Sequence, residues 1–340
     1  MVAPIALPAL DRLQRPLHDL RVSVTDRCNF RCRYCMPREH FDGEHRYLPS
    51  ADILSFEEIT RIASVGERLG LRKIRLTGGE PLLRSDLPRL VEQLARIDDV
   101  EIALTTNGAL LGKHARALRD AGLARLTVSL DTLDPTLFAR MTDSDFPVAE
   151  VLANIEHAHA VGFGPIKINA VVRRGLNEHT VVELARHFKG TGDIVRFIEY
   201  MDVGATNGWR LDQVLSGRDI VQQIDRELPL APVPANYPGE VAGRYRYQDG
   251  SGEIGVITSV TEPFCGSCSR LRLSADGKIF GCLFARVGLD LRAVLRSEGG
   301  DAALEQALRG FWSARSDRYS EQRSAETRSL PRAEMSYLGG

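Results

Sequence analysis

Hydrophobic and polar residues alternate in regular blocks from residue 20 to residue 200. Short runs rich in β-branched residues, typical of buried strands, take turns with longer segments whose apolar residues recur at helical spacing. The short runs predict strands at residues 21–25, 73–77, 101–106, 125–130, 166–172 and 194–201. The longer segments predict helices at residues 55–70, 85–97, 112–122, 148–162 and 178–190. Repeated βα units of this kind indicate a parallel sheet with right-handed crossovers.

This repetition predicts an α/β protein whose residues 1–201 form a partial (βα)6 TIM-type barrel. An open, doubly wound sheet is the alternative, because both folds share the pattern. Beyond residue 201 the regularity ends, and the pattern predicts a helix at 217–227, two short strands and a helical stretch at 290–313. We expect residues 202–340 to form a smaller C-terminal α+β extension that covers the open side of the barrel.

The six cysteines fall into two groups of three. Cys28, Cys32 and Cys35 have the spacing C-x3-C-x2-C, whereas the second group, Cys265, Cys268 and Cys282, has the spacing C-x2-C-x13-C. A [4Fe–4S] cluster normally takes four thiolates, so three ligands leave one iron open to bind a small molecule. We therefore predict one such cluster on each triplet.

Two other uses of the cysteines are weighed against clusters. Structural disulfides fit poorly with a chain of 340 residues, which can bury a full core without them. The second triplet, completed by a histidine, would suit zinc in a zinc-stabilised interaction module. The first triplet suits zinc less well, because its three thiolates crowd into eight residues.

Charge and composition exclude several classes of protein. The formal net charge of −1 argues against a nucleic-acid-binding surface. No run approaches the roughly 20 apolar residues of a membrane helix. The first twenty residues lack a basic segment and are interrupted by Pro4 and Pro8, so we expect no signal peptide and a cytoplasmic location.

Polar residues gather where the predicted strands end. In parallel α/β folds, ligands bind at the carboxyl ends of the strands. The sequence TGGEP, residues 77–81, follows the second strand, and Thr106, Ser129, Lys167 and Met201 lie on or near the ends of others. On a strand, Arg270 and Arg272 would point to the same side and suit an anionic substrate beside the second triplet.

Two motifs resemble those of a known superfamily. CNFRCRYC resembles the cysteine signature of the radical S-adenosylmethionine (SAM) superfamily, and TGGEP resembles its glycine-rich SAM-binding motif. The finer match is to the GTP 3′,8-cyclase family of molybdenum cofactor biosynthesis. It rests on RCNFRCRYCMP, IRLTGGEPLLR, LTTNG, VSLDTLDP, IKINAVV, FIEYMDVG, TEPFCGSCSRLRLSADGKIFGCLF and the terminal Gly339–Gly340, and covers nearly the whole chain.

The resemblance implies a role for particular residues. The first triplet would hold the SAM-cleaving cluster and the second triplet the substrate cluster. SAM would contact Tyr34, Gly79, Ser129 and Met201. GTP would contact Arg21, Arg75, Thr106, Lys167, Arg270 and Arg272, while Lys73 and Arg196 are left open. Gly339 and Gly340 would complete the active site.

The resemblance also implies the reaction and its partners. GTP would become (8S)-3′,8-cyclo-7,8-dihydroguanosine 5′-triphosphate, with release of 5′-deoxyadenosine and methionine, as the first step of molybdenum cofactor biosynthesis. The expected partners are a reductase or flavodoxin-type electron donor and a downstream cyclic pyranopterin synthase, with the chain a monomer or homodimer. The alternative within the superfamily is a two-cluster enzyme that modifies a peptide.

Overall fold

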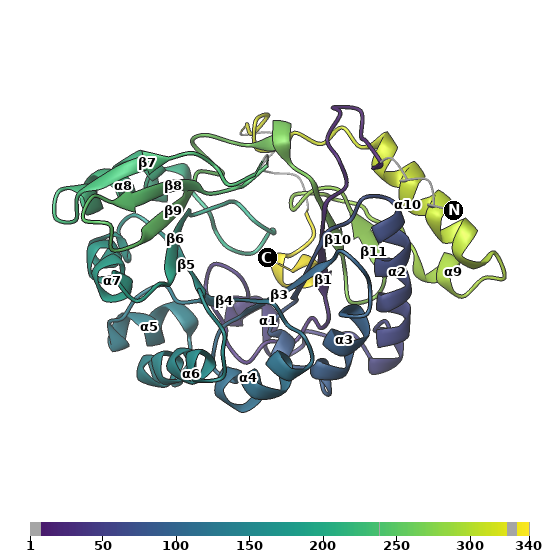
Figure 1. The fold of residues 1–340 in the computed structure, drawn as a ribbon, viewed down its shortest axis with the longest axis horizontal. Coiled ribbons are helices and arrows are strands. Elements are labelled where there is room, and N and C mark those ends of the chain that lie inside the picture. The colour runs from purple at the N-terminus through teal and green to yellow at the C-terminus, as the bar shows by residue number, and fades with distance from the viewer. Residues whose placement is uncertain (1–7, 238, 325–331, 340) are drawn as a thin grey trace.

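The strands of the protein form one continuous, curved sheet. The structure is a computed structural model that describes residues 8–237, 239–324 and 332–339. Its twelve strands run in the order β12-β11-β10-β1-β2-β3-β4-β5-β6-β9-β8-β7. The parallel centre consists of β1 (Asp19–Ser23), β2 (Lys73–Thr77), β3 (Glu101–Thr106), β4 (Arg125–Ser129), β5 (Lys167–Val172) and β6 (Ile194–Glu199). Figure 1 shows this centre bent into an open barrel.

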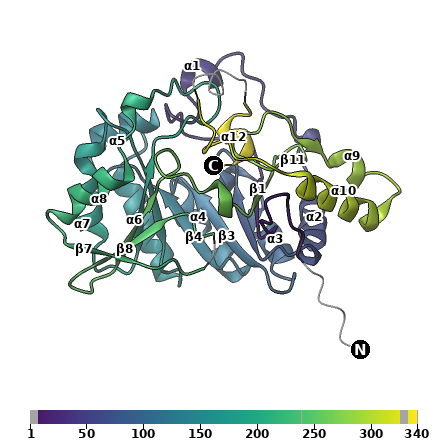
Figure 2. The same cartoon turned by 90° about the horizontal axis from the view of Figure 1, so that it is seen from above.

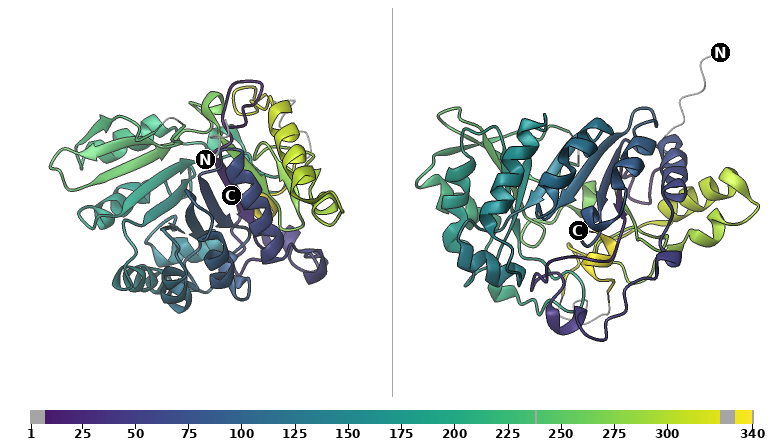
Figure 3. Two further views of the ribbon diagram at one scale, coloured as in Figure 1. Left: turned by 45° about the vertical axis from the view of Figure 1, so that its right-hand side comes forward. Right: turned by 90° about the horizontal axis from the view of Figure 1, so that it is seen from below.

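The helices that follow the barrel strands cover the outer face of the sheet (Figures 1 and 3). They are α2 (Phe56–Arg68), α3 (Leu87–Leu94), α4 (Leu111–Asp120), α6 (Val148–Ala160) and α7 (Val181–Phe188). Helix α2 begins with the capping box that Ser55 and Glu58 predict, and both of its hydrogen bonds are present. Helices on the outer face alone fit a partial barrel and not a doubly wound sheet. The predicted fold class is therefore confirmed.

Three local predictions differ from the structure. The first strand begins and ends two residues earlier than expected, at Asp19–Ser23. The segment expected as a polar loop after β4 contains a helix, α5 (Pro135–Thr142), because Asp134 caps it by accepting a hydrogen bond from the Leu137 amide at 2.7 Å. The expected helical stretch at 290–313 is divided into β12 (Leu289–Asp290), α9 (Arg292–Leu295) and α10 (Gly300–Ala314).

The C-terminal part of the chain extends the barrel sheet at both edges. At one edge β9 (Glu253–Ile257) is parallel to β6, followed by the antiparallel strands β8 (Gly243–Tyr247) and β7 (Leu230–Val233). At the other edge β10 (Arg270–Leu273) is parallel to β1 and is followed by β11 (Lys278–Phe280) and β12. The chain between β9 and β10, residues 258–269, therefore crosses the open side of the barrel.

The remaining helices lie in three places. Helix α1 (Arg38–Phe41) follows the first cysteine loop, and α8 (Gly217–Asp225) packs against β6 and β9. Helix α12 (Met335–Leu338) lies inside the curve of the sheet and contacts β1 (Figure 2). In the part of the chain that the structure describes, no helix is long and apolar enough to cross a membrane.

Candidate active site

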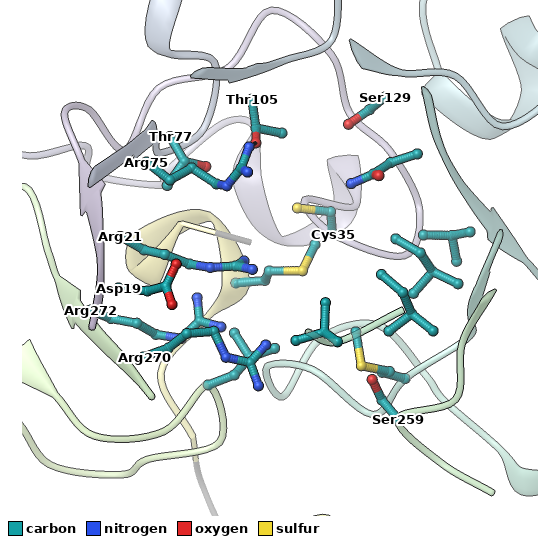
Figure 4. Close-up of a pocket in the computed structure, with 18 of the residues that line it drawn as sticks. Asp19, Arg21, Cys35, Arg75, Thr77, Thr105, Ser129, Ser259, Arg270 and Arg272 are labelled. Atoms are coloured by element: carbon teal, nitrogen blue, oxygen red, sulfur yellow. Dashed lines mark hydrogen bonds between the residues drawn. The ribbon is translucent and has the colours of Figure 1, made fainter. Parts of the chain in front are cut away.

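One cavity inside the barrel collects the predicted site residues. Alternate residues of each barrel strand face it, as the two-residue period of a strand requires. From β1 and β2 these are Arg21 and Arg75, and from β10 they are Arg270 and Arg272; Figure 4 shows that all four arginines extend from the same side, with Cys35 to their right in the view. Its lining includes all six cysteines and every described residue predicted to contact SAM or GTP.

The first cysteine loop and the TGGEP loop are held against each other. The Gly79 amide donates to the Thr25 carbonyl at 2.9 Å, and the Glu80 amide donates to the Arg27 carbonyl at 2.8 Å. A Cβ on Gly79 would lie 2.2 Å from the Arg27 carbonyl oxygen, so no other residue fits there without a shift. Besides any contact with a ligand, Gly79 therefore allows the two loops to touch.

Glu80 is a buried connector between the TGGEP loop and the end of β3. Its carboxylate accepts hydrogen bonds from the Leu82 amide, the Asn107 amide and the Thr106 hydroxyl at 2.8–3.0 Å. Burial raises its pKa to about 7. The Thr106 hydroxyl is thus already engaged, whereas the neighbouring Thr105 hydroxyl accepts a hydrogen bond from Arg75 at 3.0 Å inside the cavity. The contact of Thr106 with GTP stays a prediction.

A second buried carboxylate lies beside the first cysteine triplet. The Tyr34 hydroxyl donates to Asp131 at 2.8 Å, and the other Asp131 oxygen accepts from the Val171 amide at 2.8 Å. Burial raises the pKa of Asp131 to about 6, so it is negatively charged at neutral pH. Ser129 and Met201 line the same cavity. This side of the cavity is suited to a ligand with a positive charge.

The opposite side of the cavity holds an excess of positive charge. Six cationic side chains of the cavity form no ion pair with a carboxylate of the described residues: Arg21, Arg75, Lys167, Arg196, Arg270 and Arg272. Burial, and then the neighbouring Arg196, lower the pKa of Lys167 to about 7. Burial, and then Arg75, lower the pKa of Arg196 to about 9. Burial and mutual repulsion destabilise the charged forms of these cations. A bound anion with several negative charges would offset that repulsion, so the arrangement suits such a ligand.

The two residues left open by the sequence differ in this respect. Lys73 is already paired with Glu101 at 2.8 Å. Arg196 has no carboxylate partner among the described residues, and its Nε donates to the Asn169 amide oxygen at 2.9 Å. The geometry therefore favours Arg196 over Lys73 as a contact for an anion.

Buried arginines surround the second triplet. Arg315 donates to the Cys268 carbonyl at 2.8 Å and to its sulfur at 3.3 Å, while Arg15 donates to the Cys265 carbonyl at 2.7 Å. The Asp11 carboxylate pairs with both guanidinium groups, at 2.6 Å from Arg15 and 3.1 Å from Arg315. Although burial opposes ionisation, Arg270 and Arg315 lower the pKa of the Cys268 thiol to about 6. These arginines therefore favour the thiolate form of Cys268, the form that binds a metal.

All six cysteines are half-buried free thiols. Among the described residues, no three His, Cys, Asp or Glu side chains are close enough together to hold a single metal ion.

The C-terminal tail reaches the cavity. The Arg272 guanidinium donates to the Gly339 carbonyl at 2.6 Å. Gly339 has a φ of +72°, and a Cβ there would lie 2.2 Å from Cγ2 of Thr77, which precedes the TGGEP glycines. Met335 lines the cavity as well. Gly340 lies outside the described residues.

Several cavity residues were not singled out from the sequence. Thr105 and Asn169 face the cavity at alternate positions of strands that were predicted, so the two-residue period could have identified them. Asp131 gave no such signal, because an acidic residue after a strand is usually part of a turn. Arg15 and Asp11 belong to the N-terminal segment, and nothing in the sequence places that segment beside residues 265–268.

Comparison with known proteins agrees with this site. Residues 22–188 match the family model described as the Radical SAM superfamily, and residues 193–321 match the one described as Molybdenum Cofactor Synthesis C. A GTP 3′,8-cyclase of Acidothermus cellulolyticus is 55% identical over 98% of this chain and 99% of its own length. One of Staphylococcus aureus is 45% identical, covering 97% and 98%.

Among solved structures, Streptococcus suis SuiB bound to S-adenosylmethionine has a TM-score of 0.61 at 16% identity and covers 87% of this chain and 68% of its own. SuiB bound to its precursor peptide SuiA gives a TM-score of 0.62 at 15% identity, covering 89% and 68%. These likenesses show the fold alone. Near full-length identity of 44–55% goes further, and by it the chain belongs to the GTP 3′,8-cyclase family of the radical SAM superfamily.

Proposed function

We propose that this chain converts GTP and SAM into (8S)-3′,8-cyclo-7,8-dihydroguanosine 5′-triphosphate, 5′-deoxyadenosine and methionine, the first step of molybdenum cofactor biosynthesis. The observation that carries the proposal is a single cavity with two cysteine triplets and a set of cations without carboxylate partners among the described residues. The names of the relatives support the same reaction.

The first triplet fits a [4Fe–4S] cluster with SAM on its open iron. Its three thiols line the cavity directly beside the glycine loop. When bound, the cluster and SAM supply one-electron cleavage of the sulfonium and a radical that removes a hydrogen atom from the substrate. The chain's own part is to orient SAM, and Asp131, Tyr34 and the TGGEP loop are placed to attract its positive charge.

The second triplet fits a further [4Fe–4S] cluster, whose open iron would meet the guanine of GTP. Three thiols again line the cavity, and Arg270 and Arg315 lower the pKa of one of them, Cys268. The hydrogen bonds from Arg15 and Arg315 to the cysteine carbonyls hold the loop in place for the ligand. A zinc ion at this site would be the main alternative.

The unpaired cations would bind the triphosphate. Arginine forks bind phosphate oxygens in pairs, and a buried lysine gains its proton when an anion arrives. Bound in this way, the ribose of GTP would lie between the arginine side and the SAM side, with its 3′ hydrogen directed to the SAM side. Gly339 and Gly340 would close the space between them.

The overall change fixes what must be supplied from outside. Cyclisation rearranges the atoms of GTP, while cleavage of SAM and completion of the dihydropurine together take two electrons and a proton. A separate electron donor is therefore required, and a cyclic pyranopterin synthase would consume the product. We propose residues 1–201 and 202–340 as the two functional units of a monomer or homodimer.

An anaerobic assay of the reconstituted protein tests the function. With SAM, GTP and a chemical reductant, we expect 5′-deoxyadenosine and a cyclic GTP isomer in equal amounts. Substitution of ATP for GTP should remove the cyclic product. Formation of a modified peptide instead, or protein with one zinc and no sulfide, would contradict the proposal.

A further inference from the structure

A second cavity, separate from the active site, is lined by five arginines. It has a volume of about 570 Å³ and is formed by the first cysteine loop, α5, the segment after β5 and the segment before α8. Its basic residues are Arg33, Arg140, Arg173, Arg174 and Arg210, against a single acidic residue, Asp212. In a chain whose net charge is −1, this is a strong local excess of positive charge.

Most of these arginines are available to a partner. Arg33, Arg140 and Arg173 form no ion pair with an acidic side chain of the described residues. Arg174 is 3.5 Å from Asp219, and Arg210 is 3.1 Å from Asp212; both are exposed pairs, which contribute little. Leu211 beside them is 59% exposed. Arginines around an exposed apolar side chain are typical of protein interfaces.

The cavity lies directly behind the first cysteine triplet. Tyr34 and Val171 line both this cavity and the active site, so one layer of side chains separates the two. Arg33 stands between Cys32 and Cys35 and is exposed, while Cys32, Tyr34 and Cys35 line the active site. The outer face of the cluster loop is therefore part of the basic cavity.

We propose that this surface, defined by Arg33, Arg140, Arg173, Arg174 and Arg210, is where an acidic one-electron carrier protein docks to reduce the first cluster. The proposal rests on the proposed function, which needs electrons from outside. In each encounter the carrier would lose one electron, and the cluster held by the first triplet would gain it. No bond is formed or broken, and no proton is transferred. During the proposed reaction the active site would be filled by substrate and by the tail, so a protein donor would have to act through the wall of the barrel.

Charge complementarity favours an acidic protein over a small anion. Steering by such a patch raises the rate of encounter and does not need a tight complex, which suits the small, transient interfaces of electron transfer. An arginine cavity of this volume could also take a phosphate or nucleotide, and the experiment is designed to separate the two.

The test measures 5′-deoxyadenosine formation with SAM and GTP while the concentration of photoreduced flavodoxin, an acidic flavin protein, is varied. The variant is Arg140→Glu with Arg210→Glu, two exposed residues outside the cluster loop. The matched control is Arg96→Glu with Arg116→Glu. Both of these are exposed. Arg96 pairs with Glu92, Arg116 forms no ion pair with a described residue, and neither arginine lines the active site or the basic cavity.

We expect the KM for flavodoxin, and its Kd measured by calorimetry without SAM or GTP, to rise about tenfold in the first variant at low ionic strength and to stay unchanged in the control. Added salt should raise the KM of the wild type for flavodoxin toward that of the variant, whose KM should change little. With titanium(III) citrate as reductant, both variants should match the wild type. An unchanged flavodoxin KM, or an equal loss with titanium(III) citrate, would overturn the docking surface.

Two further outcomes are informative. Calorimetric binding of inorganic phosphate or GTP that disappears in Arg140→Glu/Arg210→Glu, with the flavodoxin KM unchanged, would assign the cavity to a small anion and overturn the proposal. Absence of cyclisation by wild-type protein with titanium(III) citrate would instead contradict the proposed function. The two failures are therefore distinguishable.

Discussion

The two cysteine triplets share one cavity but differ in the charged side chains beside them. Around the first triplet, burial and then Glu80 raise the pKa of Cys28 to about 11, and Asp131 adds to the negative charge near Cys32. Beside the second triplet, Arg270 and Arg315 lower the pKa of Cys268 to about 6 although burial opposes them, whereas burial raises the pKa of Cys282 to about 11. SAM carries a positive sulfonium and GTP a negative triphosphate. We therefore expect SAM to bind on the side of the first triplet and GTP on the side of the second.

Loss of one cysteine from either triplet should have the largest effect on activity and cluster content. Cys28→Ala should abolish SAM cleavage, because the cluster that binds SAM loses a ligand. Cys282→Ala should keep the first cluster and lose cyclisation. The iron and sulfide contents should each fall from about eight per chain to about four in either variant. Cys282→Ala with a full complement of iron would show that the second triplet holds no cluster.

Gly339→Ala should disrupt the link between the two sides. The new methyl group would collide with Thr77, and φ is positive at this residue, so the tail must leave its place beside Arg272. We expect cyclisation to fall on the order of a hundredfold. Cluster content and melting temperature should stay near those of wild type.

Gly310→Ala is the control for that change, since its Cβ would meet no atom within 4 Å and it lies in α10. It should leave cyclisation intact and stabilise the helix slightly. Normal cyclisation by Gly339→Ala would show that the tail is not required in this position.

A pair of substitutions on opposite sides sharpens the comparison. Arg272→Ala should weaken GTP binding by about 1.5–3 kcal/mol, the range for charged hydrogen bonds, and leave SAM binding nearly unchanged. Asp131→Asn should do the reverse, with SAM binding weaker by about 1–2 kcal/mol. Equilibrium binding of each ligand to both reconstituted variants measures this. Equal losses of both ligands in one variant would mean that the cavity does not separate charge.

The pH dependence of GTP binding should show the smallest effect. In the empty cavity the pKa of Lys167 is lowered to about 7, and a bound triphosphate would raise it again. GTP binding above pH 7 then takes up a proton, so the affinity should fall as pH rises, by at most about tenfold per pH unit. Calorimetry in two buffers of different ionisation enthalpy measures the proton. Lys167→Arg should bind GTP without that uptake; if the slope persists, another group is responsible.

The sequence predicted the barrel well because its signals are local. Strands β2 and β3 have the predicted bounds, and the cavity face follows from their two-residue period. The pairing of β9 with β6 and of β10 with β1 could not be predicted, since it joins segments far apart in the chain and depends on the curvature of the whole sheet. For the same reason the sequence could not predict the contact of Arg15 with the second cysteine loop or the pairing of Asp11 with Arg315. The hydrogen bond from Thr106 to Glu80 also joins segments far apart in the chain, so the motif alone could not predict it.

The way in which the C-terminal strands extend both edges of the sheet has a consequence for synthesis. Until β9 and β10 have formed, β1 and β6 are open parallel edges, and open edges pair readily with other chains. A nascent chain or a fragment that ends at residue 201 should therefore aggregate, although it contains every βα unit of the barrel. The twelve residues from 258 to 269 also limit how far the two edges can separate, to about 40 Å at full extension. The segment that carries Cys265 and Cys268 therefore connects the two edges of the open barrel and limits how far they can separate.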